Sequence, residues 1–435
     1  MSEDIKPYRY EPIALSSEST VVAEFLPDQK DVRETAYQSE AELEKAFIAQ
    51  LQLQAYAYLP ITSEATLIAN LRNQLEKLNK ITFTDVEWER FFSTCVASAN
   101  DGIIEKTARL QEDHIQVLKR DDGTIKNIYL LDKQNIHNNS LQVVNQYEVP
   151  RDEQGAVRAS RFDVTILVNG LPMVHIELKR RGVDIREAFN QINRYQRDSF
   201  WAGCGLFEYV QLFVISNGTL TKYYSNTVRD GHLAEQRSAR SRQKTSNSFS
   251  FTSWWADAAN KPITELSGFT KTFFAKHALL NILTRYCVFD VDRKLLVMRP
   301  YQIVAAEQIL QRIATSTNHR QLGSIAAGGY VWHTTGSGKT LTSFKAAQLA
   351  RGLADIDKVL FVVDRKDLDY QTMREYERFG KGAANSNTST AVLQKQLEDP
   401  NARIIITTIQ KLSRFVTVVV KLNWPQTSGC SNNSV

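Results

Sequence analysis

The chain has little cysteine: Cys95, Cys204, Cys287 and Cys430 are its four cysteines in 435 residues. None forms a C-x-x-C pair or stands near a histidine cluster, so the sequence predicts neither structural zinc nor a disulfide framework. It also lacks any run approaching ~18 apolar residues, and its polar, acidic start does not resemble a secretory signal. We therefore expect a cytoplasmic protein that is neither secreted nor membrane-spanning.

The chain has no strong excess of either charge. Its formal net charge is +5, with 43% hydrophobic and 23% charged residues, values that are ordinary for a soluble globular protein. This charge permits DNA binding without requiring it, because a local basic face matters more than the net value. A length of 435 residues supports two or three domains.

A glycine-rich segment, Thr335-Gly336-Ser337-Gly338-Lys339-Thr340, predicts an ATP site. Its glycines leave backbone N–H groups free to wrap phosphate oxygens, its lysine reaches the outer phosphates, and its last threonine offers a hydroxyl to Mg²⁺. Residues 329–332 read as a short buried strand entering the loop, and residues 341–354 as a helix whose N-terminus faces the phosphates. His333 stands where the strict P-loop has glycine, and the shorter form is the one seen in helicase-like motors. A chance Gly/Ser turn is the alternative.

A predicted hairpin brings together a second set of polar side chains. Strand-like residues 162–168 and 172–179 flank Asn169-Gly170, a strong turn signal. A two-residue loop would mix polar and apolar side chains on both faces, whereas a three-residue loop over 169–171 separates them. The second register pairs Val164 with Ile176, Ile166 with Val174 and Val168 with Pro172 on one face, and Asp163 with Glu177 and Thr165 with His175 on the other.

The polar face of this hairpin is suited to a metal. Asp163, Glu177 and the backbone carbonyl of Leu178 form an oxygen site for Mg²⁺, which polarises a phosphodiester and activates water. Lys179 points the same way as Glu177 because it stands two residues further along the strand. It is expected to orient the water or stabilise developing charge. An ordinary exposed salt-bridge ladder is the alternative.

A helix predicted over residues 184–199 follows the hairpin. Gln191 and Tyr195 stand at positions i and i+4 on one of its faces, and both are candidates to face the scissile strand. In the alternative interpretation Tyr195 is an aromatic at the edge of the core and Gln191 a solvated neighbour.

These segments, in this order, resemble the N-terminal part of the R subunit of a type I restriction enzyme, the ATP-dependent DNA translocase and endonuclease of those systems. The resemblance extends from about residue 37 to about residue 414. Arg161-Phe162-Asp163 with Ile176-Glu177-Leu178-Lys179 is similar to the PD-(D/E)XK nuclease core, with Phe162 in place of the nominal proline. The resemblance implies catalytic roles for Asp163, Glu177, Lys179, Gln191 and Tyr195.

Other segments add to the resemblance. Arg299-Pro300-Tyr301-Gln302 resembles the adenine-reading element, which implies that Gln302 contacts the base. Residues 364–371 and 407–412 resemble the next two motifs of superfamily 2 helicases, which touch the DNA backbone or support the nucleotide site. This implies such roles for Arg365, Thr407, Thr408 and Gln410. Residues 39–44 resemble the first helix of the nuclease fold, which often supplies a further acid, here Glu40 or Glu44.

The expected fold is α/β: a PD-(D/E)XK nuclease core over residues 30–235 and a partial RecA-like parallel-sheet domain over 263–415. Residues 1–29 form a polar arm, and residues 236–262 a basic, Ser-rich linker, with a DNA contact as the alternative. Mg²⁺ and ATP are the expected cofactors. Double-stranded DNA and the methyltransferase and specificity subunits are the partners that the resemblance implies.

Residues 416–435 match nothing expected of the family. The acidic strand end and the second RecA-like domain that hydrolysis requires are also missing, so the sequence indicates a truncated R subunit without ATP hydrolysis or translocation. Two other interpretations stay open: a nuclease that works alone beside a vestigial nucleotide fold, and a non-catalytic competitor for the methyltransferase core or DNA.

Overall fold

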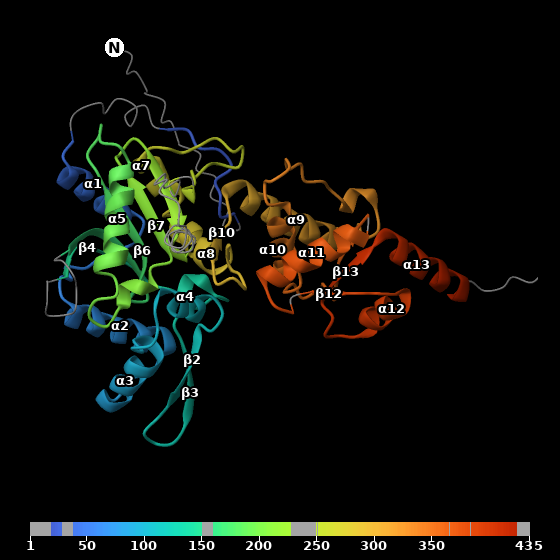
Figure 1. Cartoon of the computed structure of the whole chain (residues 1–435), viewed down its shortest axis with the longest axis horizontal. Helices are drawn as coiled ribbons and strands as arrows, with labels where there is room; N and C mark the ends of the chain where they lie inside the picture. Colours follow the sequence, from blue (N-terminus) through green and yellow to red (C-terminus); the bar gives the residue numbers. More distant parts are fainter. Residues whose placement is uncertain are drawn as a thin grey trace, which may run out of the picture. The chain divides into compact units, whose positions relative to one another are not determined.

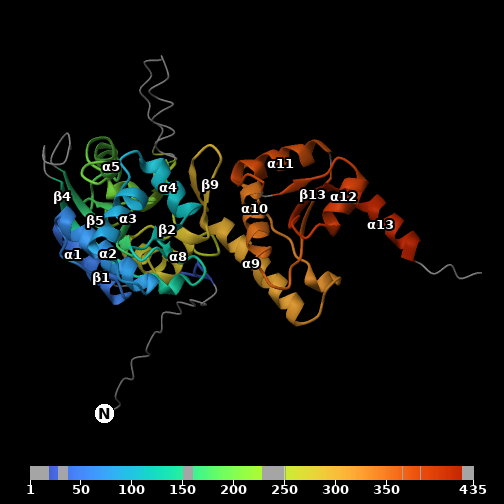
Figure 2. The same cartoon turned by 90° about the horizontal axis from the view of Figure 1, so that it is seen from below.

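The computed structural model describes residues 19–27, 38–149, 160–227, 249, 251–364, 366–382 and 384–423. The chain divides into two compact units, Met1–Ala305 and Ala306–Val435. Both combine helices with sheets that contain parallel strands (Figures 1 and 2), so the α/β class is confirmed. Among the described residues, no helix has the length and apolar content needed to cross a bilayer.

The first unit holds most of the secondary structure. Its elements in chain order are α1 (Glu40–Leu53), β1 (Ala57–Tyr58), α2 (Glu64–Asn79), α3 (Asp85–Phe91), η2 (Phe92–Val96), α4 (Ile103–Gln111), β2 (Ile115–Lys119), β3 (Ile125–Tyr129), η3 (Ile136–Asn138), β4 (Leu141–Val149), β5 (Ser160–Val168), β6 (Leu171–Leu178), α5 (Arg186–Asp198), η4 (Leu206–Tyr209), β7 (Leu212–Ser216), β8 (Thr221–Ser225), α7 (Leu266–Thr272), α8 (Lys276–Thr284), β9 (Cys287–Phe289) and β10 (Leu295–Val297).

A six-stranded mixed sheet forms the centre of this unit, in the order β1-β4-β5-β6-β7-β8. The pairs β1/β4 and β6/β7 are parallel and the others antiparallel. Every residue of β6 and of β7 is buried, as expected of central strands covered on both faces. Helix α5 packs on β6 and β7 and lies beside them in Figure 1.

Helix α1 begins at a capping box, in which Ser39 and Glu42 exchange side-chain and backbone hydrogen bonds that fix the start of the helix. Its buried face consists of Leu43, Glu44, Phe47, Ile48 and Leu51. Glu44 is the one charged residue of that face, and α1 packs on β6. The helix therefore presents a carboxylate to the sheet.

The turn of the central hairpin differs from the prediction. Val164 pairs with Ile176, Thr165 with His175 and Ile166 with Val174, as predicted, but nearer the turn Leu167 faces Pro172 and Val168 faces Leu171. The three-residue loop and the Val168–Pro172 pair are therefore wrong. Asn169 and Gly170, with φ of 51° and 84°, form a two-residue turn whose twist suits a hairpin, and a bulge at Met173 restores the predicted register.

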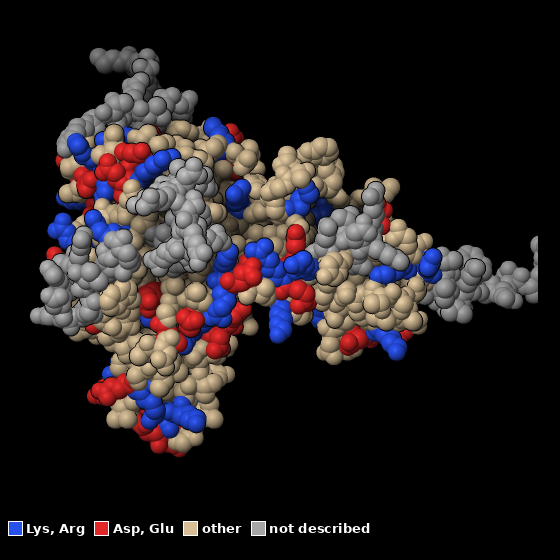
Figure 3. All heavy atoms as spheres, in the orientation of Figure 1, with Lys and Arg blue, Asp and Glu red and all other residues tan. Residues whose placement is uncertain are grey.

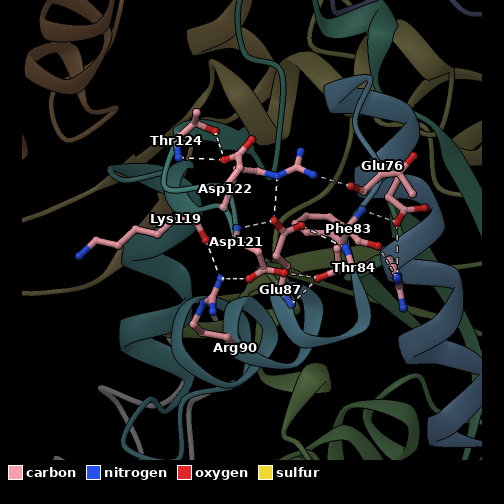
Figure 4. Close-up of polar contacts among 12 residues, drawn as sticks. Glu76, Phe83, Thr84, Glu87, Arg90, Lys119, Asp121, Asp122 and Thr124 are labelled. Carbon is pink, nitrogen blue, oxygen red and sulfur yellow. Dashed lines mark hydrogen bonds and ion pairs between the residues drawn. The ribbon is translucent and has the colours of Figure 1, made fainter.

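The two-stranded sheet of β2 and β3 is anchored to α3 by a buried carboxylate. Glu87 is 1% exposed. Its side chain accepts hydrogen bonds from Arg120 Nε at 2.9 Å and from the backbone N–H of Asp121 at 2.9 Å and of Thr84 at 3.1 Å (Figure 4). These bonds satisfy a charge that would otherwise be costly to bury.

Residues 263–305, which the sequence assigned to the motor domain, pack in the first unit. They contain the two helices α7 and α8. Phe269 in α7 and Phe273 and Phe274 between the two helices are fully buried. Tyr56 Oη donates to the carbonyl of Phe274 at 2.7 Å. Burial of such large apolar side chains stabilises the packing of this segment in the first unit, so the segment lies outside the domain to which the sequence pattern assigned it.

The predicted arm and linker lie partly outside the described residues. Within residues 19–27, Val21 and Val22 are buried, so this part of the arm is packed rather than loosely held. Within the predicted linker, Trp255 is fully buried and Ser253 bridges to Tyr223. The end of that segment therefore belongs to the core, while residues 1–18, 28–37, 228–248 and 250 are not described.

The second unit contains a three-stranded parallel sheet in the order β11-β13-β12. Helix α9 (Pro300–Asn318) crosses the division of the chain, and η6 (Ile325–Ala327), α10 (Lys339–Ala350), β11 (Val359–Val363), α11 (Lys366–Phe379), β12 (Asn385–Ser386), α12 (Thr390–Glu398), β13 (Ile404–Thr408) and α13 (Ile409–Asn423) follow. Helices alternate with strands, as parallel connections require. Of the predicted tail, residues 416–423 continue α13 and residues 424–435 are not described.

The strand predicted over residues 329–332 is wrong. These residues form no strand, and Tyr330 and Trp332 are 92% and 88% exposed. A strand needs partners for its backbone groups, and in the described part of the second unit β11, β13 and β12 pair only with one another.

Candidate active site

The four residues predicted for the nuclease centre lie together. Continuing the observed register from Val164 and Ile176 by one residue places Asp163 opposite Glu177. Asp163 Oδ2 accepts a hydrogen bond from the backbone N–H of Leu178 at 3.0 Å. Lys179 Nζ donates to Glu177 Oε1 at 3.1 Å and to the carbonyl of Leu178 at 2.9 Å.

The two carboxyl groups hold protons unusually tightly. Burial, followed by the negative charge of Glu177, raises the pKa of Asp163 to about 7. Burial also raises the pKa of Glu177 to about 7, although the nearby Lys179 acts in the opposite direction. A half-buried and a fully buried acid with perturbed pKa values beside a pocket are typical of a functional site. A bound cation would favour their charged forms.

The donor set fits a hard divalent cation. Glu177 Oε2 is buried without a hydrogen-bond partner, so one carboxylate oxygen has its coordination capacity unused. Among the described residues, no group of three or more His, Cys, Asp and Glu side chains could hold a metal ion. The centre thus offers two carboxylates and a carbonyl, a set that suits Mg²⁺ completed by water rather than Zn²⁺.

Helix α5 contributes the two further predicted residues. Gln191 Nε2 donates to Tyr195 Oη at 2.5 Å, and Tyr195 Oη donates to the carbonyl of Arg161 at 2.7 Å. Burial raises the pKa of Tyr195 well above its ordinary value, so the phenol stays protonated and acts as a donor. Tyr195 is 2% exposed, yet it and Gln191 both line the pocket beside Asp163.

This pocket has a volume of about 480 Å³ and is mostly polar. Its lining residues are Glu40, Ser160, Arg161, Asp163, Lys179, Gln191, Arg194 and Tyr195. The sequence reasoning missed Arg194 as a site residue, although its position three residues after Gln191 on one helix face was a usable signal. It also used Thr165 and His175 only to set the register. Three cationic side chains, Arg161, Lys179 and Arg194, thus line the pocket that Asp163 faces.

Both candidate acids of α1 lie near the centre. Glu40 Oε1 accepts from the backbone N–H of Arg180 at 3.4 Å, and Glu40 lines the pocket. Glu44 is buried, and its two carboxylate oxygens accept from the side chains of Asn145 and Gln146. Burial raises the pKa of Glu44, and the negative charge of Asp163 adds to that effect. The choice between the two acids stays a prediction.

The glycine-rich loop has the backbone shape that its glycines suggested. Gly336 and Gly338 both have φ of 79°, a left-handed conformation that favours glycine, and Gly338 caps the start of α10. Lys339 Nζ donates to the carbonyl of Thr334 at 3.0 Å. The predicted phosphate contacts of the loop, residues Thr335, Gly336, Ser337, Gly338, Lys339 and Thr340, stay predictions.

The other motor residues lie at the carboxyl ends of two paired strands. Thr407 and Thr408 end β13 and are fully buried, and Thr407 Oγ1 donates to Asn387 Oδ1 at 3.0 Å. Gln410 Nε2 donates to the carbonyl of Asp364, just beyond β11, at 2.9 Å. This is the edge at which open α/β sheets bind ligands.

Two further predicted residues are not brought to this edge by any described contact. Arg365 lies outside the described residues. Gln302 accepts from the backbone N–H of Arg299 at 2.9 Å and belongs to the first unit. Their roles with DNA and adenine stay predictions.

Comparison with known proteins matches the earlier and the later part of the chain to two different families. Residues 37–232 match the family described as the N terminus of type I restriction enzyme R proteins, and residues 301–428 match the SWI2/SNF2 ATPase family. The EcoprrI type I restriction enzyme endonuclease subunit of Escherichia coli is 46% identical over 312 residues, covering 72% of this chain and 93% of that protein. The chain belongs to the type I restriction enzyme endonuclease subunit family.

Longer members of this family show the same similarity over a smaller share of their length. A type I restriction enzyme endonuclease subunit of Staphylococcus saprophyticus is 41% identical over 386 residues, covering 87% of this chain and 37% of that protein. One of Staphylococcus aureus is 40% identical over 387 residues, covering 88% of this chain and 38% of that protein. The chain therefore spans little more than a third of these two family members.

Proposed function

We propose that this endonuclease subunit cleaves double-stranded DNA at a Mg²⁺-dependent centre of PD-(D/E)XK type, built by Asp163, Glu177, Leu178 and Lys179. The observation that carries the proposal is the meeting of two high-pKa carboxylates and an ammonium group beside a polar pocket. In longer family members we expect this cleavage to be coupled to ATP-driven translocation, and we expect methyltransferase and specificity subunits as partners.

Asp163, Glu177 and the Leu178 carbonyl are the proposed metal ligands, with Glu44 or Glu40 as a further acid. Bound Mg²⁺ would polarise the phosphodiester and lower the pKa of an attacking water. Lys179 now donates to two of these proposed ligands, Glu177 Oε1 and the Leu178 carbonyl. Because a cation at the ligands would compete with this ammonium group, bound metal would free Lys179 to orient water or to stabilise the charge of the transition state.

The pocket also offers groups that hold the DNA strand. Arg161 and Arg194 line it together with Gln191 and Tyr195, and such side chains commonly contact phosphate oxygens. The visible surface carries Lys and Arg interspersed with Asp and Glu (Figure 3), in line with a net charge of only +5. DNA affinity therefore rests on local contacts of this kind rather than on a strong overall field.

For the second unit we propose ATP binding by Thr335–Thr340. The loop backbone and the start of α10 would hold the phosphates, Lys339 would turn from the Thr334 carbonyl to the outer phosphates, and Thr340 would contact Mg²⁺. A nuclease that acts alone is the second candidate function. It is favoured by the fact that the nuclease residues all lie within the first unit.

The test is nicking of supercoiled plasmid with and without Mg²⁺. Asp163→Asn and Lys179→Ala are expected to lower the rate by at least about 10²-fold while leaving ATP binding unchanged. Glu187→Gln and Lys45→Ala change exposed residues of α5 and α1 and serve as controls that keep activity. Mg²⁺-independent nicking, or full activity of Asp163→Asn, would refute the proposed centre.

Glu40→Gln and Glu44→Gln decide between the two acids of α1. The variant that lowers Mg²⁺ affinity identifies the acid that belongs to the metal site. The other variant is expected to bind Mg²⁺ like the unmodified chain.

A further inference from the structure

Two buried polar atoms beneath the proposed centre face each other. His175 and Glu177 are both fully buried. Both lie on the same face of β6, because side chains two positions apart along a strand point to the same face. His175 Nε2 lies 3.6 Å from Glu177 Oε2. Neither atom has a hydrogen-bond partner, although buried polar atoms nearly always have one.

The surroundings of His175 exclude water. Its ring meets four aromatic rings edge-on: Phe200 at 5.4 Å, Phe162 at 5.5 Å, Tyr195 at 5.9 Å and Phe213 at 6.4 Å between centroids. The ring is fully buried, and a charged imidazole is costly in such surroundings, so the neutral form is favoured. In a neutral imidazole one nitrogen donates and the other accepts.

The second ring nitrogen determines which of the two donates. His175 Nδ1 lies 3.2 Å from Thr165 Oγ1, on the neighbouring strand. If the hydroxyl donates to Nδ1, then Nε2 carries the proton and points at Glu177 Oε2. The opposite tautomer would place two lone pairs against each other whenever Glu177 is ionised, the form that binds a metal.

We propose that His175, held by Thr165, is a positioning residue that fixes the Glu177 carboxylate for metal binding. The proposal rests on the proposed Mg²⁺ centre and assigns it a buried partner. A small closure of the 3.6 Å separation converts the facing atoms into a hydrogen bond to the charged carboxylate. Such partners of metal-binding carboxylates typically change metal affinity by about 10- to 100-fold when removed.

Four variants separate positioning from packing. His175→Phe keeps an aromatic ring among its neighbours but removes both nitrogens. His175→Gln replaces the ring by a side chain whose amide reaches toward the Nε2 position. Thr165→Val removes the hydroxyl at nearly constant volume, and Thr165→Ser keeps it. His137→Gln, at an exposed histidine of η3, is the control.

Calorimetric titration with Mg²⁺ or Mn²⁺ is the first measurement. His175→Phe is expected to weaken binding by about 10-fold or more, Thr165→Val by less, and His175→Gln and Thr165→Ser to stay within about threefold of the unmodified chain. Equal loss in His175→Phe and His175→Gln would show that the ring matters only for packing. Unchanged affinity in a folded His175→Phe variant would overturn the proposal.

The tautomer of His175 is the second measurement and needs no metal. In a ¹⁵N-histidine-labelled chain observed at alkaline pH, the His175 signal should report a proton on Nε2 and should move in Glu177→Gln and in Thr165→Val. A proton on Nδ1 would overturn the proposal. If Asp163→Asn leaves metal affinity unchanged, the Mg²⁺ centre itself fails, whereas this second measurement still shows whether His175 donates to Glu177.

Discussion

The nuclease centre and the glycine-rich loop were the two strongest signals in the sequence, yet the two segments differ in the structure. The strands that carry the first, β5 and β6, are hydrogen-bonded to each other and flanked by β4 and β7. The segment that leads into the second, residues 329–332, forms no strand, and Trp332 is 88% exposed. In a hairpin the two paired strands are neighbours in the chain. A strand before a phosphate loop instead needs partner strands from distant parts of the chain.

The charged side chains of the two segments also differ in their surroundings. Asp163 and Glu177 sit where burial raises their pKa values to about 7, which requires a dense core around them. Lys339 is exposed, and its described bonds are to the carbonyls of Thr334 and His333. The proposed nuclease centre is therefore preorganised by packing, while the glycine-rich loop depends on its own backbone conformation.

Substitution of the hairpin glycine should produce the largest effect. Gly170 has φ of +84°, and a Cβ there would lie 2.6 Å from Leu71 Cα in α2. Gly170→Ala is expected to destabilise the first unit by about 2–4 kcal/mol, through backbone strain and a clash with main chain. Thermal denaturation measures this. Gly329→Ala is the control, because its Cβ would meet nothing within 4 Å. Equal destabilisation by the two substitutions would show that the hairpin is no more tightly packed than the segment before the glycine-rich loop.

Removal of the half-buried Asp163 carboxylate should stabilise the metal-free chain. The folded pKa of Asp163 is about 7 against an ordinary 3.8, so its ionisation disfavours folding progressively between these values and fully above pH 7. Asp163→Asn should therefore raise stability by about 1–3 kcal/mol above pH 7, with the gain fading toward pH 4.

Denaturation across pH, with and without Mg²⁺, tests this second prediction. Because Mg²⁺ binds the ionised form, it should stabilise the unmodified chain and erase the advantage of Asp163→Asn. A destabilised Asp163→Asn chain above pH 7 would mean that the carboxylate is not under electrostatic strain.

The phosphate loop should respond to loss of its lysine in binding rather than in stability. Lys339→Ala is expected to weaken ATP binding by about 10-fold or more, since an outer phosphate loses its charged partner. Nicking by the first unit should not change. Lys395→Ala, at an exposed position of α12, is the matched control, and ATP affinity that is unaffected in Lys339→Ala would exclude the loop as the nucleotide site.

The smallest expected effect concerns the segment before the loop. Trp332→Ser should change the free energy of unfolding by less than about 0.5 kcal/mol, because the side chain is 88% exposed and surface substitutions rarely do more. A decrease of about 3 kcal/mol or more in the free energy of unfolding, as expected of a buried tryptophan, would support the buried strand that the sequence predicted.

The sequence determined what short-range pattern can determine. Alternation in β5 and β6 predicted the pairs Val164–Ile176 and Thr165–His175, and the helix predicted over residues 184–199 is α5 (Arg186–Asp198). The helix predicted after the glycine-rich loop, over residues 341–354, is α10 (Lys339–Ala350). Each depends on side chains a few residues apart, or on one turn that joins two neighbouring strands.

Only the tertiary structure decided the features that depend on distant contacts. Helix α2 approaches Gly170 closely, and the hairpin there has a two-residue turn and a bulge. The polar and apolar pattern of the sequence had suggested a three-residue loop instead. Burial of Phe269 and Phe273 against Tyr223 and Trp255 placed α7 in the first unit. The facing of His175 and Glu177 in a dry aromatic setting likewise required Phe200 and Phe213. Burial is a property of the whole packed chain, so no local pattern contains it.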